Sequence, residues 1–448
     1  MHSFIALVKK SKLQTVNSET LSVDNKQQPQ QGNSKLFSQF TDAITQTKAI
    51  TQKLTEALTS LGFKQITEEV SSVNEQTSDD EQTSNFIPLN YLGAYVVNSR
   101  EEKKIKEAQK LIDESDYEII PDIQLSLPKS ICSGEVFRRR KQILWPAESG
   151  IRQAHENGIT GNGVLIGVLD TGCDADHIQF RKKPIDFRYV PLRSGSDNLR
   201  EVRGFDVDGH GTHVCGIIAG QYIGIAPEAD LMVASVVESE TRRTSLSRIS
   251  IALDWMISQF GSVKNRSKPI IVNMSLGFKP ECLSKSEQGA LIVGIRGFIS
   301  TLVEDFDVLP VVAIGNEGPG NVRAPGYFPE TLSVGAVNFN NKPAHFSGSG
   351  PSLTGKETQP DIVGYGVNIF SSLERDINNR SLYKYMSGTS MAAPYVAGIA
   401  ALYASSDAKL QGKALRQHLL NTALPLQAPA DRVGAGLARF TENGKKIT

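Results

Sequence analysis

The sequence lacks the features that mark a disulfide scaffold, a zinc protein or a nucleic-acid-binding protein. Its 448 residues contain four cysteines, Cys132, Cys173, Cys215 and Cys282, which are scattered and form no Cys-x-x-Cys pair. Lysine plus arginine and aspartate plus glutamate both number 48, so the formal net charge is zero. This balance gives no support to nucleic acid or to an anionic membrane as the main partner.

Long apolar runs are also missing. No stretch approaches the roughly 20 apolar residues that cross a bilayer. The apolar run at residues 4–8 is too short for the hydrophobic part of a signal peptide, and lysines follow it instead of preceding it. We therefore expect a cytoplasmic protein with no membrane partner, and export by a route that needs no N-terminal signal stays open.

Composition and pattern divide the chain into four regions. Residues 1–34 are polar and rich in Gln, Ser, Asn and Lys, which predicts a flexible N-terminal segment. Residues 35–128 predict a small α+β region, residues 129–144 a linker, and residues 145–448 the main domain. Within the α+β region we expect a helix at 36–61 ended by Gly62, an acidic linker at 68–85, a strand at 94–98, a helix at 99–114 with Ser99 as N-cap, and one or two strands at 117–127 interrupted by Pro121.

The main domain alternates short apolar runs with helical patterns. This alternation predicts an α/β fold with a doubly wound, mostly parallel sheet covered by helices on both faces. In such sheets the functional site lies beyond the carboxyl ends of the strands, and Asp170 and Asn316 each follow such an end. We expect strands at 164–169, 231–237, 270–274, 308–314 and 331–337, and helices at 147–157, 210–219, 246–260, 287–303 and 391–403.

Three short segments carry the residue types of a serine nucleophile site. They read VLIGVLDTG, HGTHVCGIIAG and GTSMAAPYVAG, and they hold Asp170, His210 and Ser390 in that chain order. Ser390 lies where a turn meets a helical run, so its backbone N–H is free to stabilise an oxyanion with help from the helix dipole. Pro394 is expected in the first turn of that helix, where a missing N–H does little harm.

A serine hydroxyl needs an adjacent base, and His210 is the candidate. Asp170 ends an apolar strand and is the candidate that orients the His210 ring, although Asp174 and Asp176 are close in sequence and compete for this role. His213 lies on the same helical face as His210. Because no third ligand of suitable type is evident, we interpret His213 as structural and not as part of a metal pair.

The three segments and their order resemble the subtilisin-like (subtilase) serine endopeptidases, over roughly residues 145–436. The resemblance implies hydrolysis of peptide or protein substrates through an acyl-enzyme at Ser390, with no cofactor required for the chemistry. It implies Asn316, in AIGNEGPG, as a second oxyanion donor, and residues 326–329 as part of the pocket for the side chain before the scissile bond. It also implies that substrate backbone pairs with Ser275, Leu276 and Gly277 as an added strand.

The resemblance further implies that residues 35–128 act as an inhibitory propeptide, so that the protein is made as a zymogen with its own N-terminal region as a partner. An unrelated α+β adaptor is the alternative. The basic run at 137–141 is either a solvated segment or a processing loop between the two domains. Two alternative functions of the protein also remain. It is either a dedicated processing protease whose N-terminal region recruits one substrate, or a catalytically silent binding protein of the same fold.

The sequence departs from the family pattern at Gly364 and Tyr365, where alanine and proline are usual, and loop packing is expected to differ there. Cys173 and Cys215 lie close in sequence to catalytic candidates. We expect them to pack as small apolar residues, with a redox switch as the alternative. The family often binds structural Ca²⁺, but no ligand set can be traced in this sequence, so calcium stays open.

Overall fold

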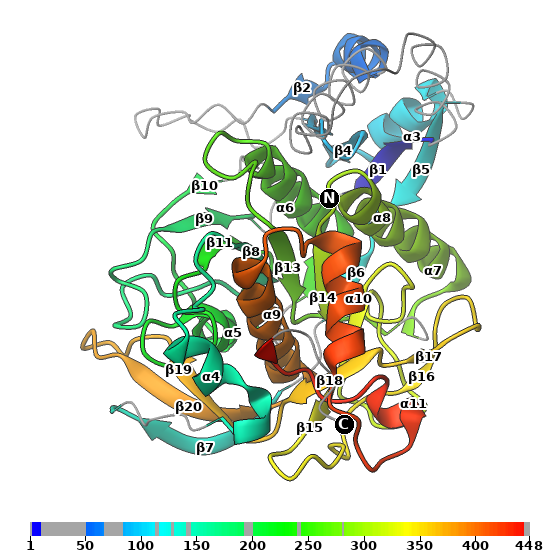
Figure 1. Ribbon diagram of the computed structural model, residues 1–448. Helices are drawn as coiled ribbons and strands as arrows, with labels where there is room; N and C mark the ends of the chain where they lie inside the picture. The colour runs from blue at the N-terminus through cyan, green and yellow to red at the C-terminus, as the bar shows by residue number, and fades with distance from the viewer. Residues whose placement is uncertain are drawn as a thin grey trace, which may run out of the picture.

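A computed structural model describes residues 2–9, 51–66, 84–112, 116–126, 130–139, 145–191, 200–239, 243–279 and 282–442. A large α/β domain carries a smaller N-terminal sheet and its helices on one side (Figure 1). Residues 68–83 of the linker expected at 68–85 and the first half of the helix expected at 36–61 lie outside the described residues. No helix in the described part of the chain is both long and apolar enough to cross a membrane.

The central sheet has eight strands in the order β10-β9-β11-β8-β13-β14-β15-β18. Every neighbouring pair is parallel except β10 with β9, which confirms the predicted doubly wound, mostly parallel sheet. The five predicted strands are present with ends shifted by no more than two residues. The bounds are β8 (Leu165–Asp170), β9 (Ile185–Tyr189), β10 (Arg200–Glu201), β11 (Asp230–Ser235), β13 (Ile270–Met274), β14 (Leu309–Ala313), β15 (Leu332–Val337) and β18 (Ile362–Tyr365).

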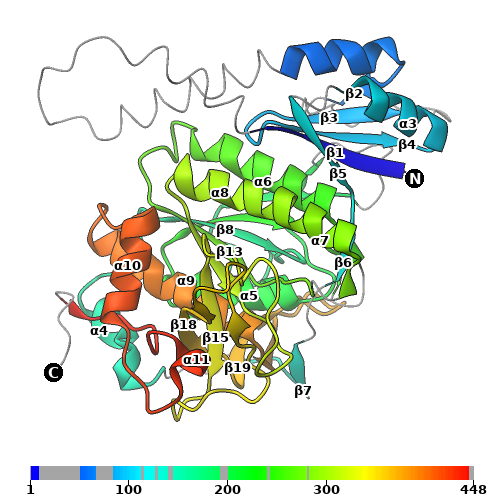
Figure 2. The ribbon, with the colours of Figure 1, turned by 90° about the vertical axis from the view of Figure 1, so that its right-hand side faces the viewer.

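Helices cover both faces of this sheet because successive side chains of its strands point to opposite sides. Ile166 and Val168 of β8 face the core that contains α5 (His210–Ala219) and α9 (Thr389–Ser406). Leu165 and Leu169 face the core that contains α6 (Leu246–Phe260) and α8 (Gly297–Glu304). Figure 2 shows α6 and α8 side by side between the central sheet and the N-terminal sheet.

Two predicted helices differ from expectation for local reasons. The helix expected at 287–303 begins earlier, as α7 (Lys285–Leu291), because Ser284 and Glu287 form a capping box. It continues through a π-helical stretch, η3 (Ile292–Arg296), into α8. The helix expected at 147–157 is divided into η1 (Ala147–Ser149) and α4 (Ile151–Glu156), because Gly150 adopts a left-handed φ of 69°.

The remaining elements lie outside the central sheet, and one of them, β7 (Ile131–Phe137), is a strand within the region 129–144 that was expected to be a linker. The helices among them lie near the C-terminus, and the strands form small ribbons at the edges of the domain. Their bounds are β7 (Ile131–Phe137), β12 (Arg243–Ser245), β16 (Gly350–Pro351), β17 (Thr358–Gln359), β19 (Ile369–Leu373), β20 (Leu382–Ser387), α10 (Gly412–Thr422) and α11 (Ala430–Val433).

The N-terminal sheet corrects the expectation of a flexible segment for residues 2–8, while residues 10–34 of that segment lie outside the described residues. Residues 2–8 form β1 (His2–Val8), which pairs antiparallel with β4 and β5 inside this sheet. The run FIALV is too short for a signal sequence but long enough for a strand covered on both faces. Phe4 and Ala6 enter the core of the N-terminal unit, while Ile5 enters the core shared with the main domain. The other strands of this sheet are β2 (Lys64–Gln65), β3 (Asn85–Leu89), β4 (Ala94–Ser99) and β5 (Tyr117–Pro121), and a further strand, β6 (Gln124–Ser126), follows outside it.

Two helices accompany this sheet, at residues 51–60 and at α3 (Glu102–Leu111). The expected N-cap at Ser99 is wrong, since the N-cap of α3 is Glu101. Ser99 ends β4, and its hydroxyl accepts the backbone N–H of Glu101 at 3.1 Å. The strand break expected at Pro121 is confirmed, because β5 ends there and β6 begins at Gln124.

Candidate active site

Ser390 lies in the first turn of α9, where the chain leaves β20 and turns at Gly388 into the helix. The helix begins at Thr389, two residues earlier than predicted, so Pro394 falls in the second turn. Because proline has no N–H, the carbonyl of Ser390 loses its usual helical donor. The hydroxyl of Ser275 donates to that carbonyl instead, at 3.0 Å, and it accepts a bond from Asn273 Nδ2 at 2.9 Å.

Asp170 and His210 form a buried pair. Asp170 is the last residue of β8 and His210 the first residue of α5, and the Oδ1 atom of Asp170 lies 2.6 Å from Nδ1 of His210. Thr171 N–H also donates to this Oδ1, at 2.8 Å, and the Thr171 hydroxyl accepts from Gly211 N–H at 2.8 Å. The carboxylate therefore holds the imidazole by Nδ1 and leaves Nε2 as the proton-accepting atom.

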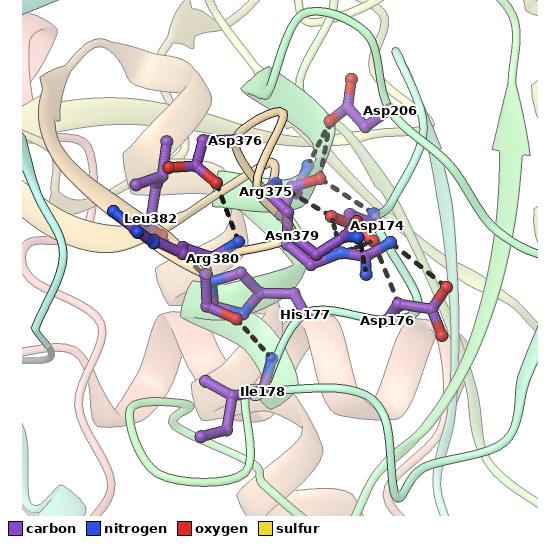
Figure 3. Close-up of polar contacts among 12 residues, drawn as sticks. Asp174, Asp176, His177, Ile178, Asp206, Arg375, Asp376, Asn379, Arg380 and Leu382 are labelled. Carbon is purple, nitrogen blue, oxygen red and sulfur yellow. Dashed lines mark hydrogen bonds and ion pairs between the residues drawn. The ribbon is translucent and has the colours of Figure 1, made fainter.

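The competing carboxylates lie elsewhere. Asp174 receives two hydrogen bonds from Arg375, by the backbone N–H and by Nε, both at 2.9 Å. Asp176 pairs with Arg203 and with Arg375. Figure 3 shows the Arg375 side chain between these two carboxylates. Among the three aspartates, Asp170 is therefore the one that the structure joins to His210.

Asp206 is a site residue that the sequence analysis missed. Its Oδ1 accepts the N–H groups of Asp208 and Gly209, each at 3.0 Å, and its Oδ2 accepts the N–H and the hydroxyl of Thr212, each at 2.8 Å. The same Thr212 hydroxyl accepts Asp174 N–H at 3.0 Å. Asp206 thus holds the first turn of α5, which carries His210. An acidic residue just before a helix was the available signal.

His213 is structural, as predicted. It is fully buried, and its Nε2 lies 3.1 Å from the carbonyl oxygens of both Ile369 in β19 and Lys384 in β20. Burial lowers the pKa of His213 to about 3. The neutral ring therefore donates from Nε2 to this strand pair at neutral pH, which fastens α5 to the hairpin that leads to Ser390.

Asn316 follows β14 and approaches the start of α9. Its side-chain oxygen accepts the backbone N–H of Thr389 at 2.8 Å and the Thr389 hydroxyl at 3.0 Å. A backbone N–H can only donate, so these bonds fix the amide with its oxygen toward Thr389. The amide nitrogen lies on the side of Gly388, where an added Cβ would meet it at 3.2 Å. Asn316 Nδ2 and the Ser390 N–H thus both lie close to Gly388.

The three residues expected to pair with substrate follow β13 directly. Ser275 and Leu276 are buried, and Ser275 contacts Ser390 through both its hydroxyl and its carbonyl. The carbonyl of Gly277 already accepts a hydrogen bond from Nη1 of Arg323 at 2.8 Å. The sequence analysis did not identify Arg323, which lies 46 residues from Gly277 in the chain.

The chain itself passes close to this site. β6, at the end of the N-terminal unit, pairs antiparallel with β12, which immediately precedes α6. A few residues later, β7 pairs antiparallel with β20, which leads to Ser390, and Ile131 lies opposite Ser387. β6 and β7 are therefore each paired with a strand edge of the main domain.

Cys173 lies three residues after Asp170, and Cys215 lies in α5, the helix that begins at His210. Both are fully buried. Burial raises the pKa of the Cys173 thiol, and the adjacent Cys215 thiol raises it further. A thiol in such surroundings is not ionised at neutral pH, so it is a poor nucleophile. This supports the packing interpretation over the redox alternative.

The family departure at Gly364 has a packing reason. A Cβ on Gly364 would lie 2.6 Å from the carbonyl oxygen of Ala392, so glycine lets β18 approach α9 closely. The next residue, Tyr365, packs against Trp145 and Tyr395 and donates its hydroxyl to Asn341 at 3.1 Å. Gly364 and Tyr365 therefore both take part in the packing next to α9. Within the described residues, no group of three His, Cys, Asp or Glu side chains could hold a metal ion.

The α/β fold and the groups gathered at the carboxyl ends of β8, β13 and β14 define the class of α/β serine proteases. Residues 161–436 match the sequence model of the subtilase family. The chain belongs to this family and is a subtilisin-like serine endopeptidase, as the sequence analysis predicted.

Several relatives are similar over much of their length. Subtilisin-like protease PopC of Myxococcus xanthus is 45% identical over 382 residues, which cover 82% of this chain and 79% of that protein. Subtilisin Savinase of Lederbergia lenta is 33% identical over 290 residues, which cover 63% and 91% respectively. A solved structure of a cold adapted subtilisin-like serine proteinase is 27% identical and covers 62% of this chain and 88% of that chain, with a TM-score of 0.48.

Proposed function

We propose that the protein cleaves peptide bonds with Ser390 as nucleophile, His210 as general base and Asp170 as the group that orients His210. The 2.6 Å contact between Asp170 and His210, beside a serine at the start of α9, is the observation that carries this proposal. In the structure the Ser390 hydroxyl donates to Ser275 O at 3.2 Å. Catalytic hydrogen bonds commonly tighten only when substrate binds, so this hydroxyl turns toward His210 Nε2 in the complex.

The reaction then proceeds in two stages. Ser390 attacks the scissile carbonyl as His210 takes its proton, and the oxyanion receives hydrogen bonds from Ser390 N–H and Asn316 Nδ2. His210 gives the proton to the leaving amine, and water then hydrolyses the acyl-enzyme with His210 again as base. Every group in this scheme belongs to the protein, so the chemistry needs no cofactor. Ser275, Leu276 and Gly277 align the substrate backbone.

We further propose that the protein is made as a zymogen in which the N-terminal unit inhibits the site. The pairing of β6 with β12 supports this, because it places N-terminal backbone along an edge beside the site. Two aspartates join the units across their contact. Asp122 accepts the N–H of Ser247 at the start of α6, at 2.9 Å, and Asp254 of α6 accepts the N–H groups of Tyr91 and Leu92 at 2.7 and 2.9 Å.

Intact mass spectrometry during incubation with casein tests this proposal. Wild-type protein is expected to cleave casein and to shed an N-terminal fragment whose boundary falls between residues 126 and 147, while Ser390→Ala stays whole. Asp254→Ala removes two bonds at the contact and is expected to increase casein cleavage before any fragment is shed. Asp186→Asn, in an exposed pair with Lys264, is the matched control. A wild-type protein that stays folded, whole and inert toward casein contradicts the zymogen proposal.

The alternative role of the N-terminal unit, recruitment of one particular substrate, predicts a different result. Deletion of residues 1–128 removes an inhibitory propeptide together with the contacts that it makes to α6, and is expected to impair folding. If the unit is an adaptor, the deleted protein folds and cleaves casein normally but loses its specific substrate. Circular dichroism and casein cleavage on the same preparation separate the two roles.

A further inference from the structure

The side chain that precedes the scissile bond has a defined place in this site. A substrate whose reacting carbonyl is held by Ser390 N–H and Asn316 Nδ2 runs along the segment 275–277. Side chains of a strand alternate between its two sides, so the residue that supplies this carbonyl directs its side chain between the ends of β13 and β14. We call this space, bounded by the segments 275–277 and 315–317, the primary pocket.

Arg323 occupies the primary pocket. Its carbon stem lies against both walls, since a Cβ added at Gly277 would meet Arg323 Cβ at 2.9 Å and a Cβ added at Gly315 would meet Arg323 Cγ at 2.9 Å. The side chain is only 7% exposed. A pocket filled in this way has little room for a large apolar side chain.

The head of Arg323 is held by both walls. Nη1 donates to Gly277 O at 2.8 Å, while Nε donates to Glu317 Oε2 at 2.9 Å and Nη2 donates to Glu317 Oε1. Within the described residues these bonds use three of the five guanidinium N–H groups. The guanidinium thus keeps donors for a ligand while its position is fixed.

Three charged side chains of the described residues meet at the primary pocket, and their charges do not cancel. Glu317 is half-buried. Burial opposes its ionisation, but the hydrogen bond and the charge of Arg323 outweigh burial and lower the pKa of Glu317. Lys279 lies 3.8 Å from the same carboxylate. Among these three described groups, Arg323 and Lys279 contribute two positive charges and Glu317 one negative charge, so their sum is one positive charge that a substrate carboxylate can balance.

We propose that Arg323 is the specificity-determining residue of this protease and that the primary pocket accepts an acidic side chain, aspartate or glutamate, before the scissile bond. This inference rests on the proposed function of Ser390. The substrate carboxylate accepts hydrogen bonds from the remaining donors of Arg323 and balances the excess charge. Large apolar and basic side chains are disfavoured, the first by the filled pocket and the second by charge.

A set of fluorogenic peptides that differ only in the residue before the scissile bond tests the proposal. With glutamate, aspartate, glutamine, alanine, phenylalanine and lysine at that position, glutamate is expected to exceed glutamine in kcat/KM by roughly tenfold or more, which is what one charge-assisted hydrogen bond contributes. Glutamine has the same shape as glutamate, so this ratio isolates charge. A ratio near one, or phenylalanine as the best substrate, overturns the proposal.

Variants test whether Arg323 causes the preference for an acidic side chain before the scissile bond. Arg323→Met keeps the length of the stem and removes the charge, and combining it with Glu317→Gln avoids leaving a carboxylate unpaired. This double variant is expected to lower the glutamate-to-glutamine ratio to near one, and Arg323→Gly is expected to raise cleavage after phenylalanine. Arg416→Met, which breaks the pair with Asp361 far from the site, is the matched control. An unchanged ratio in the double variant overturns the proposal.

Labelling by a fluorophosphonate probe tests the reactivity of Ser390 separately from the preference of the primary pocket. It reports whether Ser390 is reactive without requiring any peptide side chain to fit. If Ser390 is labelled and the glutamate peptide is not preferred, the pocket assignment is wrong and the proposed function stands. If Ser390 is not labelled and no peptide is cleaved, the proposed function fails and the pocket assignment fails with it.

Discussion

Ser275 and Ser390 are joined by two hydrogen bonds that run in opposite directions. The Ser275 hydroxyl donates to the Ser390 carbonyl at 3.0 Å, and the Ser390 hydroxyl donates to the Ser275 carbonyl at 3.2 Å. The first bond exists because Pro394 cannot supply the usual helical donor. The end of β13, which we propose aligns substrate, is thus attached directly to the residue that we propose attacks it.

Replacing Ser275 with alanine is expected to leave the buried Ser390 carbonyl without its donor, which costs about 1–3 kcal/mol. Because the first turn of α9 loses an anchor, kcat is expected to fall more than KM rises. Ser275→Thr keeps a hydroxyl and is expected to restore most of the activity. Steady-state kinetics on a short peptide measures both. Equal loss in the alanine and threonine variants contradicts a role for the hydroxyl.

Asn316→Leu keeps the approximate size of the side chain and removes its N–H donors. We expect kcat to fall by roughly 10² to 10³, the loss typical when one oxyanion donor is removed, with little change in KM. Asn321→Leu is the control, because it changes an asparagine of the same loop whose side-chain amide donates to the carbonyls of Glu317 and Pro319. A mainly KM effect in Asn316→Leu argues against oxyanion stabilisation.

Asp206→Ala removes an acceptor that receives four hydrogen bonds at the start of α5. The free energy of unfolding is expected to fall by about 1–3 kcal/mol, and kcat is expected to fall because His210 loses its fixed position. Asp186→Asn breaks only an exposed pair with Lys264 and is expected to change stability by less than about 0.5 kcal/mol. Denaturant titration and peptide kinetics test both parts.

His177 makes stability depend on pH. Burial lowers its pKa to about 4, against about 6.5 in an unfolded chain, although the Leu382 carbonyl partly opposes this. The unfolded state therefore binds more protons between these values, so the contribution of this neutral histidine is complete above about pH 6.5 and is lost as pH falls toward 4. The loss is on the order of 3 kcal/mol.

The measurement is denaturant unfolding from pH 7 to pH 4.5. His177→Gln is expected to show a shallower decline than wild type, whatever its stability at pH 7, because one titrating group is gone. His345→Gln replaces an exposed histidine and is expected to keep the wild-type decline. Identical slopes in wild type and His177→Gln would show that His177 does not contribute to the pH dependence.

The sequence was most informative where short-range patterns decide the structure. Alternating apolar runs located the strands of the central sheet, and the strand-end aspartate and helix-start serine located Asp170 and Ser390. The features that the sequence analysis missed depend on contacts with residues far away in the chain. β1 is a strand only because β4 and β5 flank it, and residues 4–8 alone look like any short apolar run.

The same reason accounts for the missed residues of the site. Arg323 reads as an ordinary loop arginine until folding brings it against Gly277, 46 residues away. Thr389 gains its role through Asn316, 73 residues earlier in the chain. The expected place of Pro394 was wrong because the start of α9 depends on the turn at Gly388 and not on the apolar run that follows it.

Labelling by a fluorophosphonate probe, followed by identification of the modified peptide, tests the catalytic assignment most directly. We expect one modified residue, Ser390, together with loss of labelling in Ser390→Ala and strongly slowed labelling in His210→Ala, while all three proteins keep the same circular dichroism spectrum. Modification of another serine, or undiminished labelling in folded Ser390→Ala, would contradict it.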